Sequence, residues 1–285
     1  MTSKKVRCSA CRTTASVPDI TMAFQPIIDI ETGAVHAYEA LVRPVGGGTA
    51  YDVLSQISDD NRYAFDQACR VKAITLAARL EMQAILSINF LPNAVYQPAA
   101  CLQKTFEAAR HAHFPVNRLM FEVTENEPAR DVGHLQSIFK EYRSHGMITA
   151  IDDFGAGHSG LNMLADFQPH VIKIDMALTR AINSDAVRYE IVGAIIGLCQ
   201  KLGISVVAEG VETVAEAVTL RDLGVRLLQG YLFAKPAVEQ LPGVAASVVD
   251  AILAAHEQRL ICAGDSVAAG SAAAADHPPA AAANA

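Results

Sequence analysis

Short apolar runs alternate with longer segments of helical spacing along most of the chain. Eight runs rich in β-branched residues predict strands at residues 24–30, 35–42, 84–90, 118–124, 147–152, 170–175, 204–209 and 226–233. Helical spacing predicts helices at residues 63–80, 133–145, 186–202 and 213–223. Because most strands alternate with helices, the pattern indicates an α/β fold with a parallel sheet. Eight such units favour a closed (β/α)8 barrel, and a flavodoxin-like open sheet is the alternative.

Composition divides the chain into three parts. Residues 1–20 are polar without an apolar period, residues 21–260 indicate one compact domain, and residues 261–285 are a low-complexity, alanine-rich tail. We expect both ends to be disordered. Cys8 and Cys11 have the C-x-x-C spacing of a zinc knuckle or a redox motif. No second Cys or His pair lies nearby in the sequence, so a structural zinc site is disfavoured.

The overall composition excludes several classes of protein. Of the 285 residues 51% are hydrophobic, which is enough to bury a substantial core. No apolar stretch approaches the ~20 residues of a membrane span, and no secretory signal is evident, which favours a cytoplasmic location. The six cysteines show no disulfide spacing, in agreement with that location. A net charge of -7 argues against a nucleic acid polymer as partner.

Polar side chains gather near the carboxyl ends of the predicted strands. They are Asn89, Glu122, Asp152, Asp153, Lys173, Asp175, Glu209 and Gln229, and Glu39 lies within the second strand. A single Asp or Asn after a strand is often a helix cap or a turn former. In a barrel, however, these strand ends converge on one mouth, which would crowd together an amide and the five carboxylates of Glu39, Glu122, Asp152, Asp153 and Glu209. Such a cluster requires cations, and oxygen ligands favour Mg²⁺ or Mn²⁺ over zinc or copper.

The segment "IDDFGAGHSG" at residues 151–160 permits two interpretations. Its glycines spell the G-x-G-x-x-G of a dinucleotide-binding loop, with Asp175 placed to hold a ribose, which would suit an oxidoreductase with a nicotinamide cofactor. That loop belongs after the first strand and before a long helix, whereas here it follows the fifth strand and leaves room for about two helical turns. The alternative is a metal site. Asp152 and Asp153 can both serve it only if the chain turns just after Asp152.

Two metal ions about 3.5–4 Å apart that share one aspartate are the usual apparatus for hydrolysis of a phosphodiester. Phosphodiester hydrolysis is therefore the chemistry that the strand ends favour. A lysine among carboxylates stays charged, so Lys173 is better suited to orient a nucleophile than to act as a free base.

Eight motifs occur in an order that resembles the EAL domain family. They are "FQPI" at 24–27, "YEALVRP" at 38–44, "SIN" at 87–89, "FEVTE" at 121–125, "DDFGAGHSG" at 152–160, "IKID" at 172–175, "VVAEGVET" at 206–213 and "QGYLFAKP" at 229–236. The resemblance implies a modified (β/α)8 barrel with one reversed strand. It also implies hydrolysis of cyclic di-GMP to the linear dinucleotide with two Mg²⁺ or Mn²⁺ ions. Members of this bacterial signalling family usually pair as homodimers through the helices after the fifth and sixth strands.

The resemblance also assigns roles to individual residues. One metal would be held by Glu39, Asn89, Glu122 and Asp152, and the second by Asp152, Asp153 and Glu209. Lys173 would contact the nucleophilic water, Gln25 and Arg43 would touch the ligand, and Gln229 would lie near the water and metals. Glu125 would anchor the glycine loop, and Asp175 and Glu212 would support the site. Simpler roles are also open. Arg43 could be a surface ion-pair partner, Lys173 could neutralise Asp175, and Glu125 and Glu212 could be ordinary first-turn acids.

The glycine loop departs from the family pattern, which commonly has threonine, tyrosine and serine where this chain has Ala156, His158 and Gly160. A receptor that binds cyclic di-GMP without hydrolysis is an alternative function. Such receptors typically lack some of the metal residues, and this chain keeps all of them.

Overall fold

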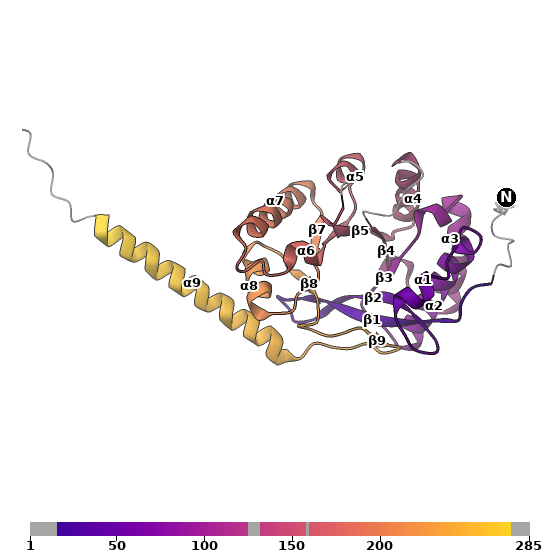
Figure 1. Ribbon diagram of the computed structural model, residues 1–285, viewed down its shortest axis with the longest axis horizontal. Coiled ribbons are helices and arrows are strands. Elements are labelled where there is room, and N and C mark those ends of the chain that lie inside the picture. Colours follow the sequence, from indigo (N-terminus) through magenta and orange to yellow (C-terminus); the bar gives the residue numbers. More distant parts are fainter. Residues whose placement is uncertain (1–15, 125–131, 158–159, 275–285) are drawn as a thin grey trace, which may run out of the picture.

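Nine strands form one sheet that closes on itself in the computed structural model, which describes residues 16–124, 132–157 and 160–274 (Figure 1). The strands are β1 (Ile20–Asp29), β2 (Val35–Pro44), β3 (Ile85–Asn89), β4 (Leu119–Thr124), β5 (Ile148–Phe154), β6 (Val171–Ile174), β7 (Ser205–Ala208), β8 (Leu227–Gln229) and β9 (Ala237–Val238). Each of β2 to β8 is parallel to the next, and β1 pairs with both β2 and β8. The predicted closed barrel is therefore confirmed.

Strand β1 is the reversed strand that the sequence led us to expect. It runs antiparallel to β2 and to β8. A short turn at residues 30–34 joins β1 to β2, with the Gly33 N–H donating to the Asp29 carbonyl oxygen at 2.8 Å. So short a connection can join antiparallel strands only, whereas the parallel strands are joined through helices. Strand β9, which extends the sheet beside β1, was not predicted, because two residues are too few to show an alternating pattern.

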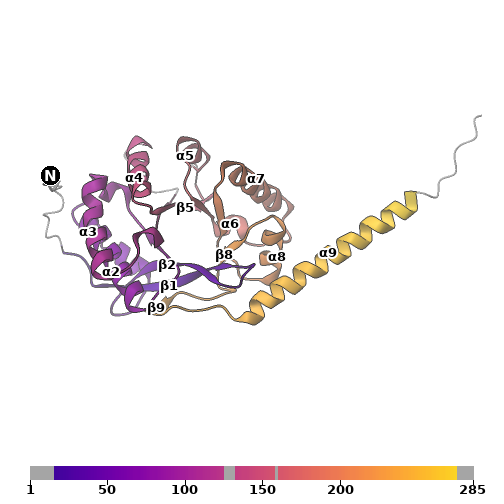
Figure 2. The same cartoon turned by 180° about the vertical axis from the view of Figure 1, so that it is seen from behind.

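Helices cover the outside of the barrel (Figures 1 and 2). They are α1 (Ala50–Leu54), α2 (Arg62–Arg79), α3 (Pro98–His111), α4 (Val132–Ser144), α5 (Gly160–Asp166), α6 (Met176–Thr179), α7 (Ala186–Leu202), α8 (Val214–Asp222) and α9 (Ala246–Ala274), with 3₁₀ turns η2 (Pro92–Ala94) and η3 (Val116–Arg118). The four predicted helices correspond to α2, α4, α7 and α8. No helix in the described part of the chain is long and apolar enough to cross a bilayer.

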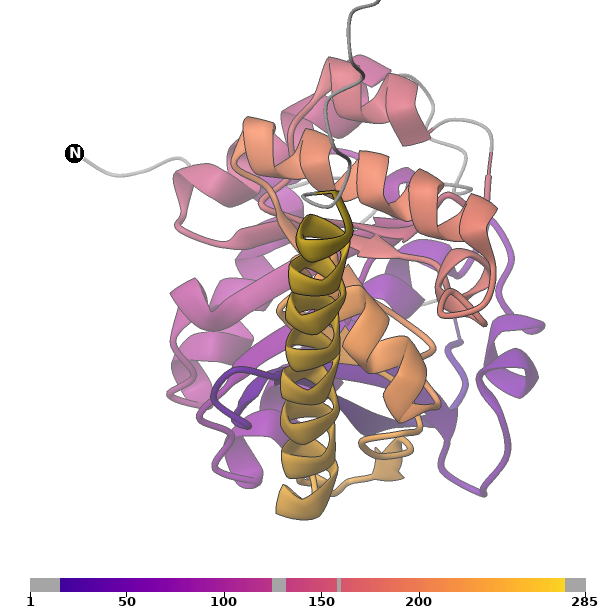
Figure 3. The ribbon, with the colours of Figure 1, turned by 90° about the vertical axis from the view of Figure 1, so that its left-hand side faces the viewer.

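Helix α9 corrects one expectation about the carboxyl-terminal region. It packs against α8, where His256 and Arg259 both contact the Asp222 carboxylate, and then leads away from the barrel (Figures 1 and 3). The helix continues to Ala274, so part of the segment expected to be a disordered tail is helical. Alanine has the highest helix propensity, and the low-complexity composition hid that preference. The C-x-x-C motif at Cys8 and Cys11 lies outside the described residues.

A layer of apolar side chains fills the barrel below its mouth. Its members are Ile27, Ala37, Met120, Ala150, Val171, Val207 and Leu227, each at most 8% exposed. Every one lies two residues from a polar residue on the same strand or just after its end, as Ala150 does from Asp152 and Val207 from Glu209. Because residues i and i+2 of a strand point to the same face, the polar residues form the next layer toward the mouth. On reversed β1 the order is inverted, with Gln25 before Ile27.

Outside the barrel, Arg70 of α2 is completely buried between the sheet and the helices. Its Nε lies 2.8 Å from Asp66 Oδ2, and its Nη1 donates to the Tyr142 hydroxyl at 2.7 Å. The guanidinium also lies over the rings of Phe90, Phe121 and Tyr142. The second carboxylate oxygen of Asp66 accepts the Leu91 N–H at 3.0 Å, which holds the chain just after β3.

Arg70→Ala should strongly destabilise the barrel, because it leaves the Asp66 carboxylate buried without its cation. We expect a loss of about 3–5 kcal/mol in the free energy of unfolding, measured by urea denaturation. Arg188→Ala is the matched control, since Arg188 pairs with Asp185 at 2.6 Å but is 40% exposed. It should cost at most about 1 kcal/mol. Equal losses for the two variants would contradict the assigned role of Arg70.

Candidate metal and phosphodiester site

The polar layer at the mouth comes from eight different strands or strand ends. It contains Gln25 on β1, Glu39 on β2, Asn89 on β3, Glu122 on β4, Asp152 and Asp153 on β5, Lys173 on β6, Glu209 just after β7, and Gln229 on β8. Strand register, rather than any local motif, brings these side chains together. Glu39 lies beside Ser87, Asn89 beside Glu122, and Thr124 beside Asp152.

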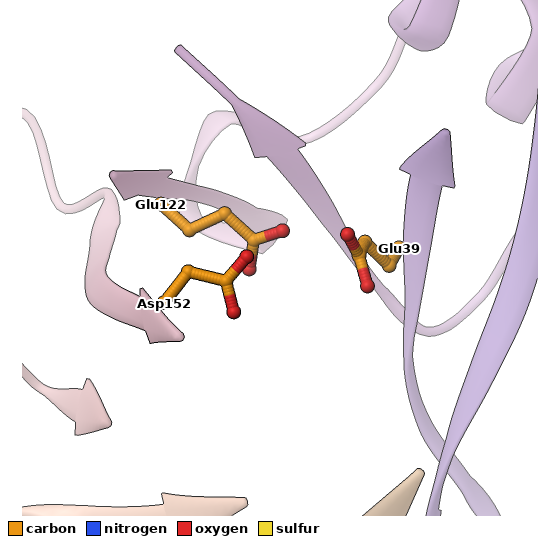
Figure 4. Close-up of side chains that lie close together, drawn as sticks. All are labelled: Glu39, Glu122 and Asp152. Carbon is orange, nitrogen blue, oxygen red and sulfur yellow. The ribbon is translucent and has the colours of Figure 1, made fainter. Parts of the chain in front are cut away.

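The carboxylates form two groups that share one member. Oxygen atoms of Glu39, Glu122 and Asp152 lie within 4.8 Å of one another, as do oxygen atoms of Asp152, Asp153 and Glu209. Figure 4 shows Glu122 and Asp152 side by side, with Glu39 facing them across the mouth. Asp152 thus occupies the position that a bridging ligand between two cations requires. The Asn89 amide joins the first group by donating to Glu39 at 3.0 Å and to Glu122 at 3.1 Å.

Lys173 is the cation at the centre of this cluster. Its Nζ lies 2.7 Å from Glu209, 2.9 Å from Asp152, 3.2 Å from Glu39 and 3.4 Å from Glu122, and the side chain is completely buried. Burial alone would lower the pKa of Lys173, but these carboxylates raise it well above its ordinary value. The ammonium therefore stays charged at neutral pH. It can orient a nucleophile or a phosphate oxygen, and it cannot accept a proton.

The pKa values of the carboxylates in this cluster shift in different directions. Burial raises the pKa values of Glu122 and Glu209 well above the ordinary value, despite the opposing charge of Lys173. Burial also raises the pKa of Asp153, to about 6, and the neighbouring Asp152 and Asp175 add to the rise. Glu39 has a lowered pKa, because Lys173, Gln229 and Asn89 outweigh the effect of its burial. One lysine therefore does not offset the burial of these carboxylates and the repulsion between them.

The turn expected after Asp152 is present. The pairing of β5 with β6 shifts register between Ile151 and Phe154, and Asp153 has a left-handed backbone with φ of 54°. An aspartate in that region is uncommon and strained by roughly 1–3 kcal/mol. Gly155 follows with φ of 95°, and the Ala156 N–H donates to the Asp153 carbonyl oxygen at 3.0 Å. This bulge lets two adjacent aspartates serve one site.

The donor set fits divalent cations that prefer oxygen. Five carboxylates and the Asn89 amide offer oxygen ligands at the mouth, and ionised carboxylates in so buried a setting are costly unless cations neutralise them. The Oε1 atom of Gln229 is also buried and receives no hydrogen bond within the described residues. Glu39, Asn89, Glu122 and Asp152 could hold one ion, and Asp152, Asp153 and Glu209 the other.

A cavity of about 370 Å³ adjoins the cluster and could receive part of a ligand. Its lining includes Met22, Leu54, Phe65, Phe90, Asp152 and Asp153. It therefore combines apolar walls with an acidic end, as many ligand pockets do. Gln25 does not line this cavity; it is buried, donates to the Ala234 carbonyl oxygen at 3.2 Å and accepts from the Gln229 amide at 3.3 Å. Arg43, at the end of β2, donates to the Val42 carbonyl oxygen and pairs with no carboxylate of the described chain.

Several predicted supporting residues lie at the edge of this cluster. Asp175 caps α6 by accepting the Ala177 N–H at 2.8 Å, and is not the ionic partner of Lys173. The carboxylate of Glu212 binds the Arg180 guanidinium at 2.8 Å, and its side chain is 41% exposed. Glu125 and His158 lie outside the described residues, so their predicted roles remain predictions.

Three supporting residues were missed in the sequence. The Ser87 hydroxyl donates to Glu122 at 2.7 Å, and the Thr179 hydroxyl donates to the Glu209 carbonyl oxygen. Glu216 accepts three backbone N–H groups of the loops around Glu209. The Ser87 signal was available, because Ser87 lies two residues before Asn89 on the inner face of its strand.

The model of the EAL domain matches residues 10–236. The blue light- and temperature-regulated antirepressor BluF of Escherichia coli is 34% identical over 78% of this chain and 56% of its own length. The probable cyclic di-GMP phosphodiesterase PdeD of the same organism is 34% identical over 74% of this chain and 40% of its length. The chain thus spans about half the length of these relatives.

Solved structures are similar over the same region. A standalone EAL protein from Vibrio cholerae, in its c-di-GMP bound form, is 51% identical, with a TM-score of 0.79 over 82% of this chain and 99% of that chain. A manganese/cyclic di-GMP complex of Klebsiella pneumoniae BlrP1 is 34% identical, with a TM-score of 0.75 over 81% of this chain and 59% of that chain. A calcium/cyclic di-GMP complex of BlrP1 also matches, at 35% identity and a TM-score of 0.75, over 79% of this chain and 57% of that chain.

The raised carboxylate pKa values predict that Mn²⁺ stabilises the protein less at low pH. Below about pH 6 the Asp153 carboxyl holds a proton that the cation must displace, which weakens binding up to tenfold per pH unit. The rise in melting temperature on adding Mn²⁺ should therefore be larger at about pH 7.5 than at about pH 5.

Without metal, the contribution of Asp153 to stability depends on pH in the opposite sense. Since the pKa of Asp153 is raised from 3.8, its contribution to stability falls as the pH rises between 3.8 and about 6. An equal Mn²⁺ effect at both pH values would contradict carboxylate ligation.

Proposed function

The chain belongs to the EAL domain family, and on that premise we propose that it is a cyclic di-GMP phosphodiesterase that forms the linear dinucleotide. The observation that carries this proposal is the pair of carboxylate groups that share Asp152 around the buried Lys173. A receptor needs to hold the ligand only. A shared aspartate between two cation positions is the arrangement that in-line hydrolysis of a phosphodiester uses.

Two Mg²⁺ or Mn²⁺ ions, when bound, would lower the pKa of a water molecule and neutralise charge on the phosphate. The protein's own residues do the rest. Glu39, Glu122, Asp152, Asp153 and Glu209 offer oxygen ligands in fixed positions, because their strands are hydrogen-bonded to one another. Lys173 holds a positive charge close to the shared Asp152, where it can orient the attacking water and stabilise charge that develops on the phosphate.

Three polar side chains are suited to hold the dinucleotide. Arg43 pairs with no carboxylate among the described residues, so its guanidinium can form a charge-assisted contact with a phosphate. Gln25 and Gln229 bind each other at 3.3 Å on the side of the mouth where β1 closes the barrel, and Gln229 also donates to Glu39 at 2.8 Å. They can orient substrate relative to the acidic cluster.

The oxidoreductase interpretation loses its structural basis. The glycine loop follows β5, and the helix after it, α5, spans only Gly160–Asp166. A dinucleotide pyrophosphate would also meet the adjacent carboxylates of Asp152 and Asp153. A receptor for cyclic di-GMP remains the competing function, and hydrolysis separates it from the enzyme.

We propose that the protein acts as a homodimer through α5 and α7. A hollow of about 650 Å³ lies between these helices, lined by Leu161, Leu178, Ile191, Ile195 and Leu198 among others. Leu161 is 63% exposed and Ile191 43%, although both are large and apolar. A second copy would cover this face, since contiguous exposed apolar patches mark interaction sites. The free thiols of Cys69, Cys101 and Cys199 suit a cytoplasmic location, which we also propose.

Hydrolysis and binding respond differently to two substitutions under this proposal. Asp153→Asn removes charge from the second cation position, so initial rates with Mg²⁺ should fall on the order of 100-fold or more while cyclic di-GMP still binds. Arg43→Ala removes a phosphate contact of about 1.5–3 kcal/mol, so the dissociation constant should rise about 10- to 100-fold. Rates come from chromatography of the nucleotides, and affinities from calorimetric titration in Ca²⁺. If the wild type binds without hydrolysis, the receptor function replaces the enzyme.

Ile191→Asp should convert the dimer to a monomer, because it places a charge in the apolar face between α5 and α7. Light scattering coupled to gel filtration measures the mass. Val71→Asp, at a 37% exposed position on α2, is the control and should leave the mass unchanged. A wild-type protein that is monomeric at all accessible concentrations would contradict the proposed interface.

A further inference from the structure

Glu216 is a buried carboxylate close to the site, and the mechanism above does not use it. It lies in the first turn of α8 and is 3% exposed. Its Oε1 accepts the Ala181 N–H at 2.9 Å, and its Oε2 accepts the N–H groups of Glu212 and Thr213, each at 3.0 Å. Burial alone would raise the pKa of Glu216, but these donors lower it below its ordinary value. The carboxylate is therefore ionised at neutral pH.

These contacts exceed what a helix cap requires. Thr213 and Glu216 form a capping box, in which each side chain accepts the other's backbone N–H. The box accounts for the Thr213 contact only. The bond to Ala181 comes from a separate loop, which follows α6 and lies 35 residues away in sequence. Ala181 has a left-handed backbone with φ of 57°, so its conformation needs support from outside the loop.

The same two loops meet again next to Glu209. The Thr179 hydroxyl donates to the Glu209 carbonyl oxygen, and the Glu209 N–H donates to the Ile174 carbonyl oxygen at 3.1 Å. Gly210 has φ of 66°, and a Cβ added there would lie 2.3 Å from the Cβ of Met176. This close approach is possible for glycine alone. The chain on both sides of the Glu209 side chain is thus held against the segment that follows β6.

We propose that Glu216 is a positioning residue that fixes the loop between β7 and α8, and so places the Glu209 carboxylate for the second divalent cation. The inference rests on the proposed function, because it concerns the same pair of cation positions. Glu216 itself does not reach the cluster. It acts through the backbone of Glu212 and Thr213, which leads back through Val211 and Gly210 to Glu209.

The carboxylate form of the side chain is what this role requires. All three partners of Glu216 are N–H donors, so an amide in its place would turn an NH₂ group toward at least one of them. Glu216→Gln keeps the size of the side chain and most of its packing. It should loosen the connection between the two loops without opening a cavity.

The test is a titration of the metal-free protein with Mn²⁺, in which unbound ion is followed by electron paramagnetic resonance. We expect the wild type to bind two ions, and Glu216→Gln to bind one of them on the order of tenfold less tightly, with the other unchanged. In assays with cyclic di-GMP, kcat should fall by a similar factor, and KM should change less than about twofold, because the substrate contacts remain.

Asp185→Asn is the matched control. Asp185 caps α7 by accepting the N–H groups of Val187 and Arg188, at 3.0 Å and 3.1 Å, but it does not touch the loop after β7. It should lower the melting temperature without changing either Mn²⁺ affinity. Thr179→Val removes the hydrogen bond to the Glu209 carbonyl oxygen and should reproduce the selective loss. It carries the test if Glu216→Gln does not fold.

Wild-type Mn²⁺ affinities in both Glu216→Gln and Thr179→Val would overturn the inference and leave Glu216 as a helix cap. The same holds if both ions weaken equally in these variants and in Asp185→Asn. A wild type that binds two Mn²⁺ ions but does not hydrolyse cyclic di-GMP would refute the proposed function. In that case the Mn²⁺ affinities of the variants still decide the role of Glu216.

Discussion

The ammonium of Lys173 makes the crowded mouth of this barrel possible. Four carboxylates lie within 3.4 Å of its Nζ, at distances where like charges in a buried setting repel strongly. One positive charge relieves this repulsion but does not cancel it, as the raised pKa values of Glu122 and Glu209 indicate. Lys173 therefore does not neutralise the carboxylate cluster, and bound divalent cations would stabilise it further.

The strand ends that carry these groups support one another beyond the regular sheet. The Phe90 N–H donates to the Glu122 carbonyl oxygen, and the Asp175 N–H donates to the Phe154 carbonyl oxygen, at 3.0 Å and 3.2 Å. The Val211 N–H continues the series to the Gln229 carbonyl oxygen at 3.1 Å. Because backbone bonds extend the ladders past the last strand residues, the polar layer is held more rigidly than loop residues usually are.

Much of this arrangement could be predicted from the sequence, because side chains along each barrel strand alternate between the inner and the outer face. On most of the parallel strands the polar residue of the mouth follows an apolar residue by two positions, as Lys173 follows Val171, so these strands predict both layers at once. The turn at Asp153 was also predictable, since two adjacent aspartates cannot otherwise share a face.

Contacts between distant loops were beyond this kind of prediction. The spacing of Thr213 and Glu216 indicates a capping box, but nothing local points to Ala181. Strand β9 was too short to show a pattern, and the helical end of α9 was hidden in alanine-rich sequence that composition alone assigns to a tail. In each case the deciding partner is far away in the chain, or the local signal is shared by two structures.

The reversed direction of β1 also decides where the domain can be joined to something else. In an ordinary (β/α)8 barrel the first strand begins at the closed bottom, opposite the active site. Here Ile20 pairs with Pro44, and the Val45 N–H donates to the Asp19 carbonyl oxygen at 3.2 Å, so β1 begins at the rim beside Arg43. A module fused before Ile20 would emerge at the rim that holds the acidic cluster. The barrel thus has its amino-terminal attachment point beside the polar mouth, so a fused module would lie next to whatever enters there.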